Sequence, residues 1–188
     1  MTRKYELKAR AESQDATRRR ITAATVELHR TVGPAQTTIS AIARTAGVQR
    51  VTVYRHFPDE RGLFAACGAH WLASDPPPDP SGWAEIADPE ERCVSGLSRL
   101  YAWYGRQEAM LANVARDAPL LPALAEVADP APLQNAMRAV LMVGRKDRRR
   151  TRAALGHALE FSTWRSLTRS QGLTDARAAR LMARLARG

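Results

Sequence analysis

The sequence predicts an all-α fold in two domains, and three features of its 188 residues lead to this prediction. Apolar residues recur every three or four positions through most of the chain, the spacing that gathers them on one face of a helix. Glycines and prolines stand between these periodic segments, where helices usually end. Residues 74–89 are rich in proline, which cannot continue a helix, so a linker and the domain boundary should fall there.

The charge of the chain favours polyanionic partners. Lys and Arg total 29 against 19 Asp and Glu, a net charge of +10. Residues 1–74 hold 12 cations and 6 anions (+6), which leaves 17 and 13 (+4) for residues 75–188. A basic balance suits nucleic acid first and a membrane surface second. Codon composition is an alternative source of the excess, since nearly all of the cations are arginine and alanine is abundant.

Two cysteines, Cys67 and Cys93, are too few for a disulfide framework, so a reducing compartment is expected. The sequence has no run of about 18 apolar residues, and its beginning lacks the apolar core of a signal peptide. We therefore expect a soluble cytoplasmic protein with no membrane partner and no cofactor.

Residues 1–14 are polar and mixed in charge, as in a flexible arm or a frayed helical extension. Such an arm could reach along DNA. Asp15 is the expected N-cap of the first helix, which should run to about Val32 and end at Gly33-Pro34. Its inward stripe is predicted to be Ile21, Ala24, Thr25, Leu28 and Val32.

Residues 37–57 have the pattern of a helix-turn-helix. A short first helix has Ile39, Ile42, Ala43 and Ala46 on one face. Gly47 should end it, because glycine adopts the left-handed backbone region at little cost, and Val48 fills the turn. A second short helix points Val53 and Phe57 inward.

The outward side of that second helix is too polar and basic for a core, and it suits phosphates and base edges. It is formed by Arg50, Val51, Thr52, Tyr54, Arg55 and His56. An ordinary helical hairpin with a solvated basic face is the alternative.

The run T-I-x-x-I-A-x-x-A-G-V-x-x-x-T-V-Y-x-x-F resembles the DNA-binding domain of tetracycline-repressor-like (TetR family) regulators. The resemblance covers Asp15 to about Leu72. It implies a three-helix DNA-binding domain over residues 15–73, after a flexible arm at 1–14. It also implies a helical domain over residues 74–188 that binds a small effector and dimerises.

On this basis we expect nine residues to contact operator DNA. Backbone contacts are expected from Thr38, Arg44, Arg55 and His56, with Tyr54 reaching a phosphate or a base. Base reading is expected from Gln49, Arg50, Val51 and Thr52, because a side chain at this start of the helix can enter the major groove.

Three positions depart from the family pattern. Gln49 stands where the family often has Ser or Thr as the N-cap of the second helix, and Gln is a poor cap. Val51 stands where Gly or Ser is common, and Glu60 stands where a lysine commonly touches phosphate. We expect Asp59 to cap the next helix, which runs to Leu72 and has Leu63, Phe64, Cys67 and Trp71 on its apolar face.

The second half reads as helices separated by Pro and Gly. The expected segments are 89–105, 108–116, 133–143, 147–170 and 175–187, with Thr174 as the cap of the last one. A proline-punctuated stretch covers residues 119–132.

Aromatic and thioether residues gather in these segments, as in a concave apolar site for a small ligand. The candidate ligand-binding residues are Tyr101, Trp103, Tyr104, Met110, Met137, Leu141, His157, Phe161 and Trp164. Each of them could instead fill the core of a helical bundle. It is the family resemblance that implies a pocket here for an apolar or aromatic effector.

No metal site is expected. His157 and Glu160 share a helix face, but two ligands do not close a site. A zinc site formed by Cys67, His70 and His56 would lack a fourth ligand. His56 also belongs to the outward side of the second helix, which is expected to contact DNA.

The family resemblance implies a homodimer formed through residues 148–187, which carry apolar residues at helix-packing spacing. A twofold dimer would place two reading helices about 34–36 Å apart or slightly farther. The sequence thus predicts a ligand-responsive repressor that is not an enzyme. Two alternatives stay open, a dimeric DNA-binding protein without an effector and an enzyme in the helical second half.

Overall fold

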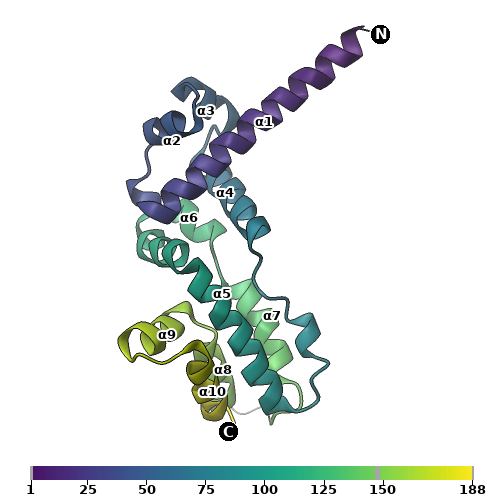
Figure 1. Ribbon diagram of the computed structural model, residues 1–188, viewed down its shortest axis with the longest axis vertical. Helices are drawn as coiled ribbons and strands as arrows, with labels where there is room; N and C mark the ends of the chain where they lie inside the picture. Colours follow the sequence, from purple (N-terminus) through teal and green to yellow (C-terminus); the bar gives the residue numbers. More distant parts are fainter. Residues whose placement is uncertain (1, 147–148, 188) are drawn as a thin grey trace. The chain divides into compact units, whose positions relative to one another are not determined.

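Every regular element that the structure describes is helical, which confirms the all-α prediction (Figure 1). The structure is a computed structural model, and it describes residues 2–146 and 149–187. This part of the chain divides into two compact units, the residues up to 76 with 112–128, and residues 77–111 with those from 129 on. Within the described residues, no helix combines the length and the apolar character that crossing a bilayer requires.

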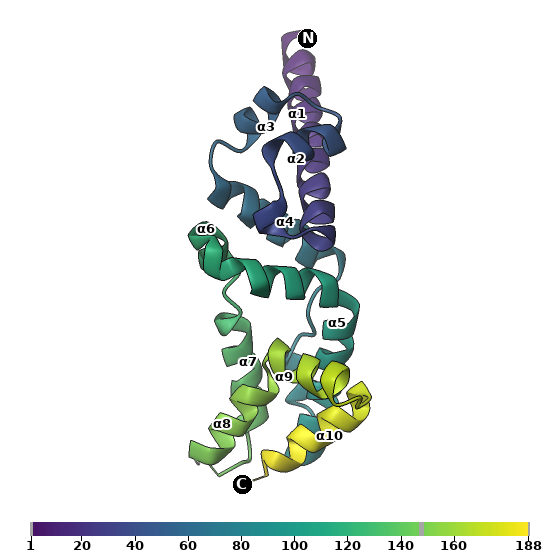
Figure 2. The same ribbon diagram turned by 90° about the vertical axis from the view of Figure 1, so that its left-hand side faces the viewer.

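The first unit packs its helices around one apolar cluster. Its helices are α1 (Thr2–Thr31), α2 (Ile39–Ala46), α3 (Arg50–His56), α4 (Glu60–Ser74), α6 (Pro122–Val127) and short 3-10 turns at Pro34–Gln36 and Ala118–Leu120. Figure 2 shows α2 and α3 beside α1 and α4. The cluster is formed by Ile21, Ala24, Ile42, Ala43, Ala46, Val53, Phe57 and Leu63. The inward faces predicted for α2 and α3 are therefore confirmed.

Helix α1 begins well before its predicted start. It runs unbroken from Thr2, so Asp15 lies inside the helix and the prediction that Asp15 is an N-cap is wrong. A cap contributes only about 1 kcal/mol and does not oblige a helix to begin there. The preceding residues are good helix formers, and Lys8 and Glu12 form an i,i+4 pair at 3.9 Å. Val32 follows the end of the helix and is 46% exposed, so it is not part of the inward stripe.

The second unit consists of the long helix α5, helices α7 to α10 and a short 3-10 turn. Its elements are Ser81–Trp83 (3-10), α5 (Pro89–Asp117, whose end from residue 112 belongs to the first unit), α7 (Ala131–Met142), α8 (Arg149–Ala158), α9 (Phe161–Arg165), a π-helical stretch at Ser166–Ser170 and α10 (Asp175–Leu185). Its buried side chains include Trp83, Cys93, Leu97, Leu100, Tyr101, Met137, Leu141, Leu155, Trp164 and Met182.

Helix α5 continues through Gly105, where the sequence predicted its end. An isolated glycine costs a helix only about 1 kcal/mol, which tertiary packing can offset. The packing partner is the Trp164 ring, whose Cζ2 would lie 3.6 Å from a Cβ at Gly105. The predicted separate segment at 108–116 is therefore part of the same helix.

The single helix predicted for residues 147–170 is broken. Helix α8 ends at Ala158, and the backbone is extended at Glu160 (ψ 133°) before α9 begins. The carbonyls at this break accept hydrogen bonds from α5, Tyr101 Oη to Ala158 O at 2.8 Å and Tyr104 Oη to Leu159 O at 2.6 Å. Both donors are distant in the sequence, so no local pattern marks the break. The predicted start at Asp147 lies outside the described residues.

The proline-rich segment contributes to the core as well as linking the units. The Trp83 side chain is fully buried in the second unit. It lies over Gly96 of α5, where an added Cβ would come within 2.8 Å of Trp83 Cε3. Gly96 therefore allows a close approach that any larger residue would prevent.

Candidate DNA-binding surface

Capping interactions fix both ends of α2, and a left-handed glycine forms the turn between α2 and α3. Gly47 has φ 65°, and its N–H donates to the carbonyls of Ala43 and Arg44. At the other end of α2, Thr38 Oγ1 accepts from Ala41 N at 3.1 Å. The predicted end of α2 at Gly47 is confirmed, and Thr38, a predicted backbone contact, also serves as an N-cap.

Helix α3 is held by its own buried apolar side chains and by an arginine of α1 at its C-terminal end. Val53 and Phe57 are buried in the core of the first unit. Arg18 Nη1 donates to His56 O at 2.8 Å, and its guanidinium carbon lies 4.1 Å from the centre of the Phe57 ring. Arg18 therefore satisfies a carbonyl at the C-terminal end of α3 and also makes a cation–π contact. Sequence reasoning missed this role because Arg18 and its partners lie on different helices, far apart in the chain.

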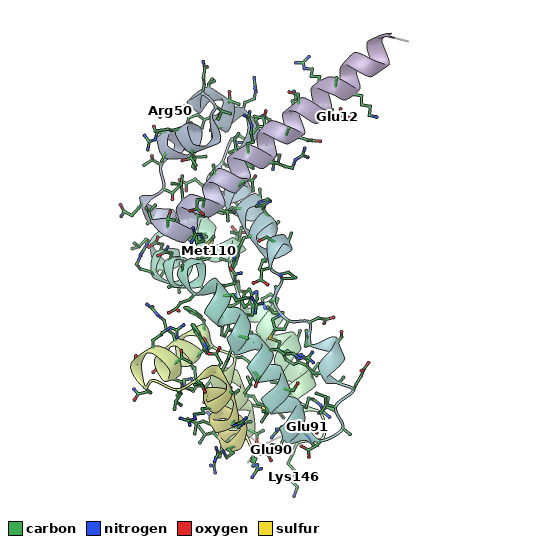
Figure 3. The ribbon with its side chains drawn as sticks, viewed as in Figure 1. Glu12, Arg50, Glu90, Glu91, Met110 and Lys146 are labelled. Atoms are coloured by element: carbon green, nitrogen blue, oxygen red, sulfur yellow. The ribbon has the colours of Figure 1, made fainter. Side chains whose placement is uncertain are left out.

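The structure brings the predicted base-reading residues together at the start of α3. The side chains of Gln49, Arg50 and Val51 are exposed, Val51 by 67%, and Thr52 is half-buried. Gln49 occupies the N-cap position, yet its side chain makes no capping bond within the described chain, which confirms that it is a poor cap. Figure 3 labels Arg50 on this helix.

The predicted backbone contacts lie around the same helix. Arg44 on α2 and Arg55 on α3 are exposed, and Tyr54 is 48% exposed. A cation on each helix and a phenol between them suit a phosphate backbone on either side of a groove.

His56 is the candidate least suited to contact DNA. Its Nε2 is buried, and no described group hydrogen-bonds to that atom. Burial lowers the pKa of His56, and the positive charges of Arg55 and Arg18 lower it further. The ring is therefore neutral at pH 7 and lies partly beneath the surface that its neighbours form.

A polar cluster at the end of α5, which the sequence did not predict, caps the end of α1. Asn113 Nδ2 donates to the carbonyls of His29 (2.9 Å) and Arg30 (3.0 Å). Arg116 Nη2 donates to Val32 O at 3.2 Å. Helix ends leave such carbonyls without intrahelical partners, so these bonds terminate α1.

Asp117 completes this cap from a nearly buried position. Its side chain accepts from Ala35 N at 3.0 Å and is bonded by Arg116 at 2.6 and 3.0 Å. The Arg116 guanidinium, rather than the other contacts, is the main reason that the pKa of Asp117 is lowered. Arg116 and Asp117 therefore lie against the end of α1 and the turn that follows it.

The buried cysteine of α4 pairs with a histidine of α1. Cys67 Sγ lies 3.4 Å from His29 Nδ1, whereas His70 is exposed. Burial lowers the pKa of His29 to about 4 and raises the pKa of Cys67 to about 12. Both groups are therefore neutral at pH 7. Among the described residues, no three His, Cys, Asp or Glu side chains gather as metal ligands would.

Five of the nine candidate ligand-binding residues form one packed aromatic cluster. Ring centres lie 5.6 Å apart for Trp103 and Tyr104, 5.5 Å for Tyr104 and Phe161, and 5.9 Å for Tyr104 and Trp164, while Tyr101 stacks on Tyr104 at 6.3 Å. The polar atoms have partners too, since both tyrosine hydroxyls bond carbonyls and Trp164 Nε1 donates to Asp175 Oδ1 at 2.9 Å. In this conformation the cluster is a core.

The other four candidates lie outside this aromatic cluster. Met110, Met137 and Leu141 are buried, and His157 is an exposed side chain bonded to Thr163 Oγ1 at 3.1 Å. A hollow of about 360 Å³ lies instead on α7 and α8, lined by Asn135, Arg138, Ala139, Met142, Arg145 and Arg152. None of the nine candidates lines it.

A helix-turn-helix with an exposed, basic second helix, followed by a helical second unit, is an arrangement typical of DNA-binding transcriptional regulators. Residues 21–67 match the sequence model of the family described as bacterial regulatory proteins, tetR family. This match runs from the buried stripe of α1 through both helices of the motif into α4. Over this domain the chain is therefore similar to TetR-family transcriptional regulators, as the resemblance of its sequence implied.

Solved structures extend the likeness over nearly the whole chain. A putative TetR-family regulator from Mesorhizobium loti is 18% identical with a TM-score of 0.65, covering 92% of this chain and 94% of that one. A TetR-like regulator from a Rhodococcus species is 18% identical at 0.62, covering 90% and 93%. The multidrug binding protein EbrR, complexed with imidazole, is 23% identical at 0.59, covering 89% and 88%. At these identities the likeness shows the fold, and a comparison with curated protein sequences gives no match.

Proposed function

We propose that this regulator binds operator DNA as a homodimer through α3 and releases it when a small molecule binds the second unit. The observation that carries the DNA-binding part is the exposure of Gln49, Arg50 and Val51 on a helix whose opposite side is buried. The exposed side of α3 makes no contribution to the core of the first unit, and its polar side chains suit contact with a major groove.

The residues divide into two roles by their place and chemistry. Arg50 can bond a guanine edge bidentately, and Val51 can contact a thymine methyl. Arg44, Arg55 and Thr38 hold the backbone. The Thr38 hydroxyl accepts from Ala41 N as a cap, so its own proton is still able to bond a phosphate oxygen.

Two copies are needed, since one short helix covers only a few base pairs. The proposed dimer interface lies on residues 148–187, but Leu155, Ala158 and Leu159 of that segment are buried in their own chain. Apolar residues of the segment that a partner could still contact include Leu167 and Leu181, which are half-buried, and Leu185, which is 50% exposed. These three are the residues whose change to a charged residue should give monomers in sedimentation.

Ligand response is supported by the fold and by the relative named as a multidrug binding protein. A coupling of about 1–3 kcal/mol would change operator affinity about 5–150-fold. Because the effect must be reciprocal, saturating operator should weaken effector binding by the same factor.

The packed aromatic cluster favours the second candidate function, a dimeric DNA-binding protein without an effector in that place. An apolar ligand among Tyr101, Tyr104 and Trp164 would have to part rings that already fill the space and break hydroxyl–carbonyl bonds. Calorimetry with and without operator separates the two candidates, and equal effector affinities in both states would exclude the coupling.

The DNA-binding proposal is tested by selecting duplexes from a random pool with the full-length protein and titrating the enriched sequence. Arg50→Ala should lose about 1–3 kcal/mol of discrimination at one position of each half-site. Arg44→Ala should weaken all sequences alike and reduce the salt dependence. Arg180→Ala, an exposed arginine on α10, is the matched control. A pool without any enriched sequence would refute the proposal.

A further inference from the structure

Residues 161–171, between α8 and α10, are joined to both helices by backbone that is not helical. These residues comprise α9 and the π-helical stretch, and α9 lies beside α5 (Figures 1 and 2). Glu160 before them is extended with ψ 133°, and Gly172 after them has φ 70°, in the left-handed region. Changes at a few residues between elements are enough to move a segment as a unit. We call residues 161–171 the covering segment.

The second half of the covering segment is π-helical, although it contains no proline or glycine. Gln171 N donates to Ser166 O, five residues back, at 3.0 Å. The guanidinium carbon of Arg169 lies 5.0 Å from the centre of the Trp164 ring. Because π-helical turns are rare and occur frequently at functional sites, this stretch is a candidate for movement or for contact with a ligand.

The inner side of the covering segment completes the aromatic cluster. The Trp164 side chain is fully buried, and its ring centre lies 5.9 Å from that of Tyr104 on α5. Its Nε1 donates to Asp175 Oδ1 at 2.9 Å. The Tyr104 hydroxyl bonds Leu159 O at 2.6 Å, and Leu159 precedes the joint at Glu160. Movement that starts at Glu160 would therefore part Trp164 from Tyr104 and leave this hydroxyl bond in place, which removes the obstacle that the packed rings otherwise present to a ligand.

The outer side of the covering segment is fastened by an ion pair near solvent. Glu108 of α5 accepts from Arg169 Nε at 2.9 Å and from Arg169 Nη2 at 2.7 Å, and Arg165 Nε lies 3.8 Å from the same carboxylate. Both arginine side chains are about half exposed, and that of Glu108 is 28% exposed. On the α8 side, Thr163 Oγ1 lies 3.1 Å from His157 Nδ1. Ion pairs at this exposure stabilise a structure only slightly, so a ligand could offset the loss of this one.

We propose that the covering segment is a lid, which Glu108 holds shut and which opens to admit a flat aromatic molecule between Tyr104 and Trp164. The inserted ring would contact both side chains, so the apolar surface that opening exposes is covered again. One ring requires a movement of only about 3.5–4.0 Å, the contact distance between carbon atoms. Use of the lid as an effector gate rests on the proposed function, whereas opening and binding do not. Because the lid belongs to the segment proposed for the dimer interface, its movement would connect binding to that interface.

Opening is tested on the full-length protein by hydrogen exchange without any ligand. The indole N–H of Trp164 reports the lid, and the backbone N–H of Leu100, which is buried on α5, reports unfolding of the whole unit. We expect the protection factor of the Trp164 indole to be at least about tenfold lower than that of Leu100, because local opening requires less free energy than global unfolding. Equal protection of the two groups would show that the segment moves only on unfolding and would overturn the lid.

Variants then show whether the ion pair is the latch. E108Q and R169Q should each lower the protection of the Trp164 indole about three- to fivefold, the size expected for a well-aligned exposed pair. The double variant should match E108Q, because both changes break the same interaction. R184Q, which changes an exposed arginine on α10, should leave the protection within about twofold. Additive losses in the double variant, or an equal loss in R184Q, would overturn the role of Glu108.

Binding is tested with quinoline, which is flat and neutral at pH 7, and with cyclohexanol, which is not aromatic. We expect quinoline to shift the Trp164 indole resonance and cyclohexanol to leave it unchanged. Since only the open lid binds, R169Q should tighten quinoline binding by the same factor by which it lowers the protection of the Trp164 indole. An unmoved Trp164 resonance with quinoline, or an affinity that is the same in R169Q and in the wild type, would overturn the aromatic site.

Operator titrations with and without quinoline separate the lid from the proposed function. A shifted Trp164 resonance with unchanged operator affinity keeps the lid and its site and removes the effector role. A protein that selects no duplex refutes the proposed function, while the exchange and quinoline experiments still decide the lid.

Discussion

Replacing Asp117 with asparagine tests the polar cap that α5 places on the end of α1. Asparagine keeps the shape and an oxygen that can accept from Ala35 N, but it removes the charge that Arg116 binds at 2.6 and 3.0 Å. A hydrogen bond to a charged group contributes about 1.5–3 kcal/mol. Because the Arg116 side chain is 55% exposed, solvent screening reduces this to about 1–2 kcal/mol.

The expected loss is measurable by urea or thermal unfolding at pH 7. For a chain of this size, about 1 kcal/mol corresponds to about 2–4 °C in the unfolding midpoint. Asp15→Asn, which changes an exposed acid on α1, should stay within about 0.5 kcal/mol of the wild type.

The pH dependence gives a sharper check. The folded protein lowers the pKa of Asp117 below the unfolded value of about 3.9, so its contribution to stability is fully present above that pH. It is lost as the pH falls through the lower, folded pKa. The difference between wild type and Asp117→Asn should therefore be constant from pH 7 to pH 5 and shrink toward pH 3. A difference at pH 7 no larger than that of the Asp15→Asn control, or one that grows in acid, would refute the role given to this carboxylate.

Two further changes probe contacts that only the folded chain reveals. Arg18→Ala should lower stability by about 1 kcal/mol and weaken binding to all duplexes without changing base preference, because Arg18 supports α3 without belonging to its exposed side. Titrations against the selected operator and a mismatched duplex check this prediction, and Arg19→Ala is the control. Gly96→Ala should cost about 1–3 kcal/mol and alter tryptophan fluorescence, because its Cβ would meet the Trp83 ring at 2.8 Å. Gly68→Ala, whose Cβ would meet no described atom within 4 Å, should be neutral or stabilising in the same unfolding experiment.

The sequence by itself determined the helix-turn-helix. Its short helices, the left-handed Gly47 and the buried Val53 are all specified by neighbours within one or two turns, so periodicity and turn chemistry were enough. The caps at Asp59 and Thr174 were predictable for the same reason, and both accept the expected backbone N–H.

Only the tertiary structure decided the features whose partners are distant in sequence. The break after Ala158 depends on tyrosine hydroxyls from α5, the end of α1 depends on Asn113 and Arg116, and α3 depends on Arg18. The arginine-lined hollow likewise forms where α7 meets α8. Residue propensities, which differ by about 1 kcal/mol, depend on local sequence and can be estimated from it. These contacts form only when helices distant in the sequence pack together, so the sequence pattern does not indicate them.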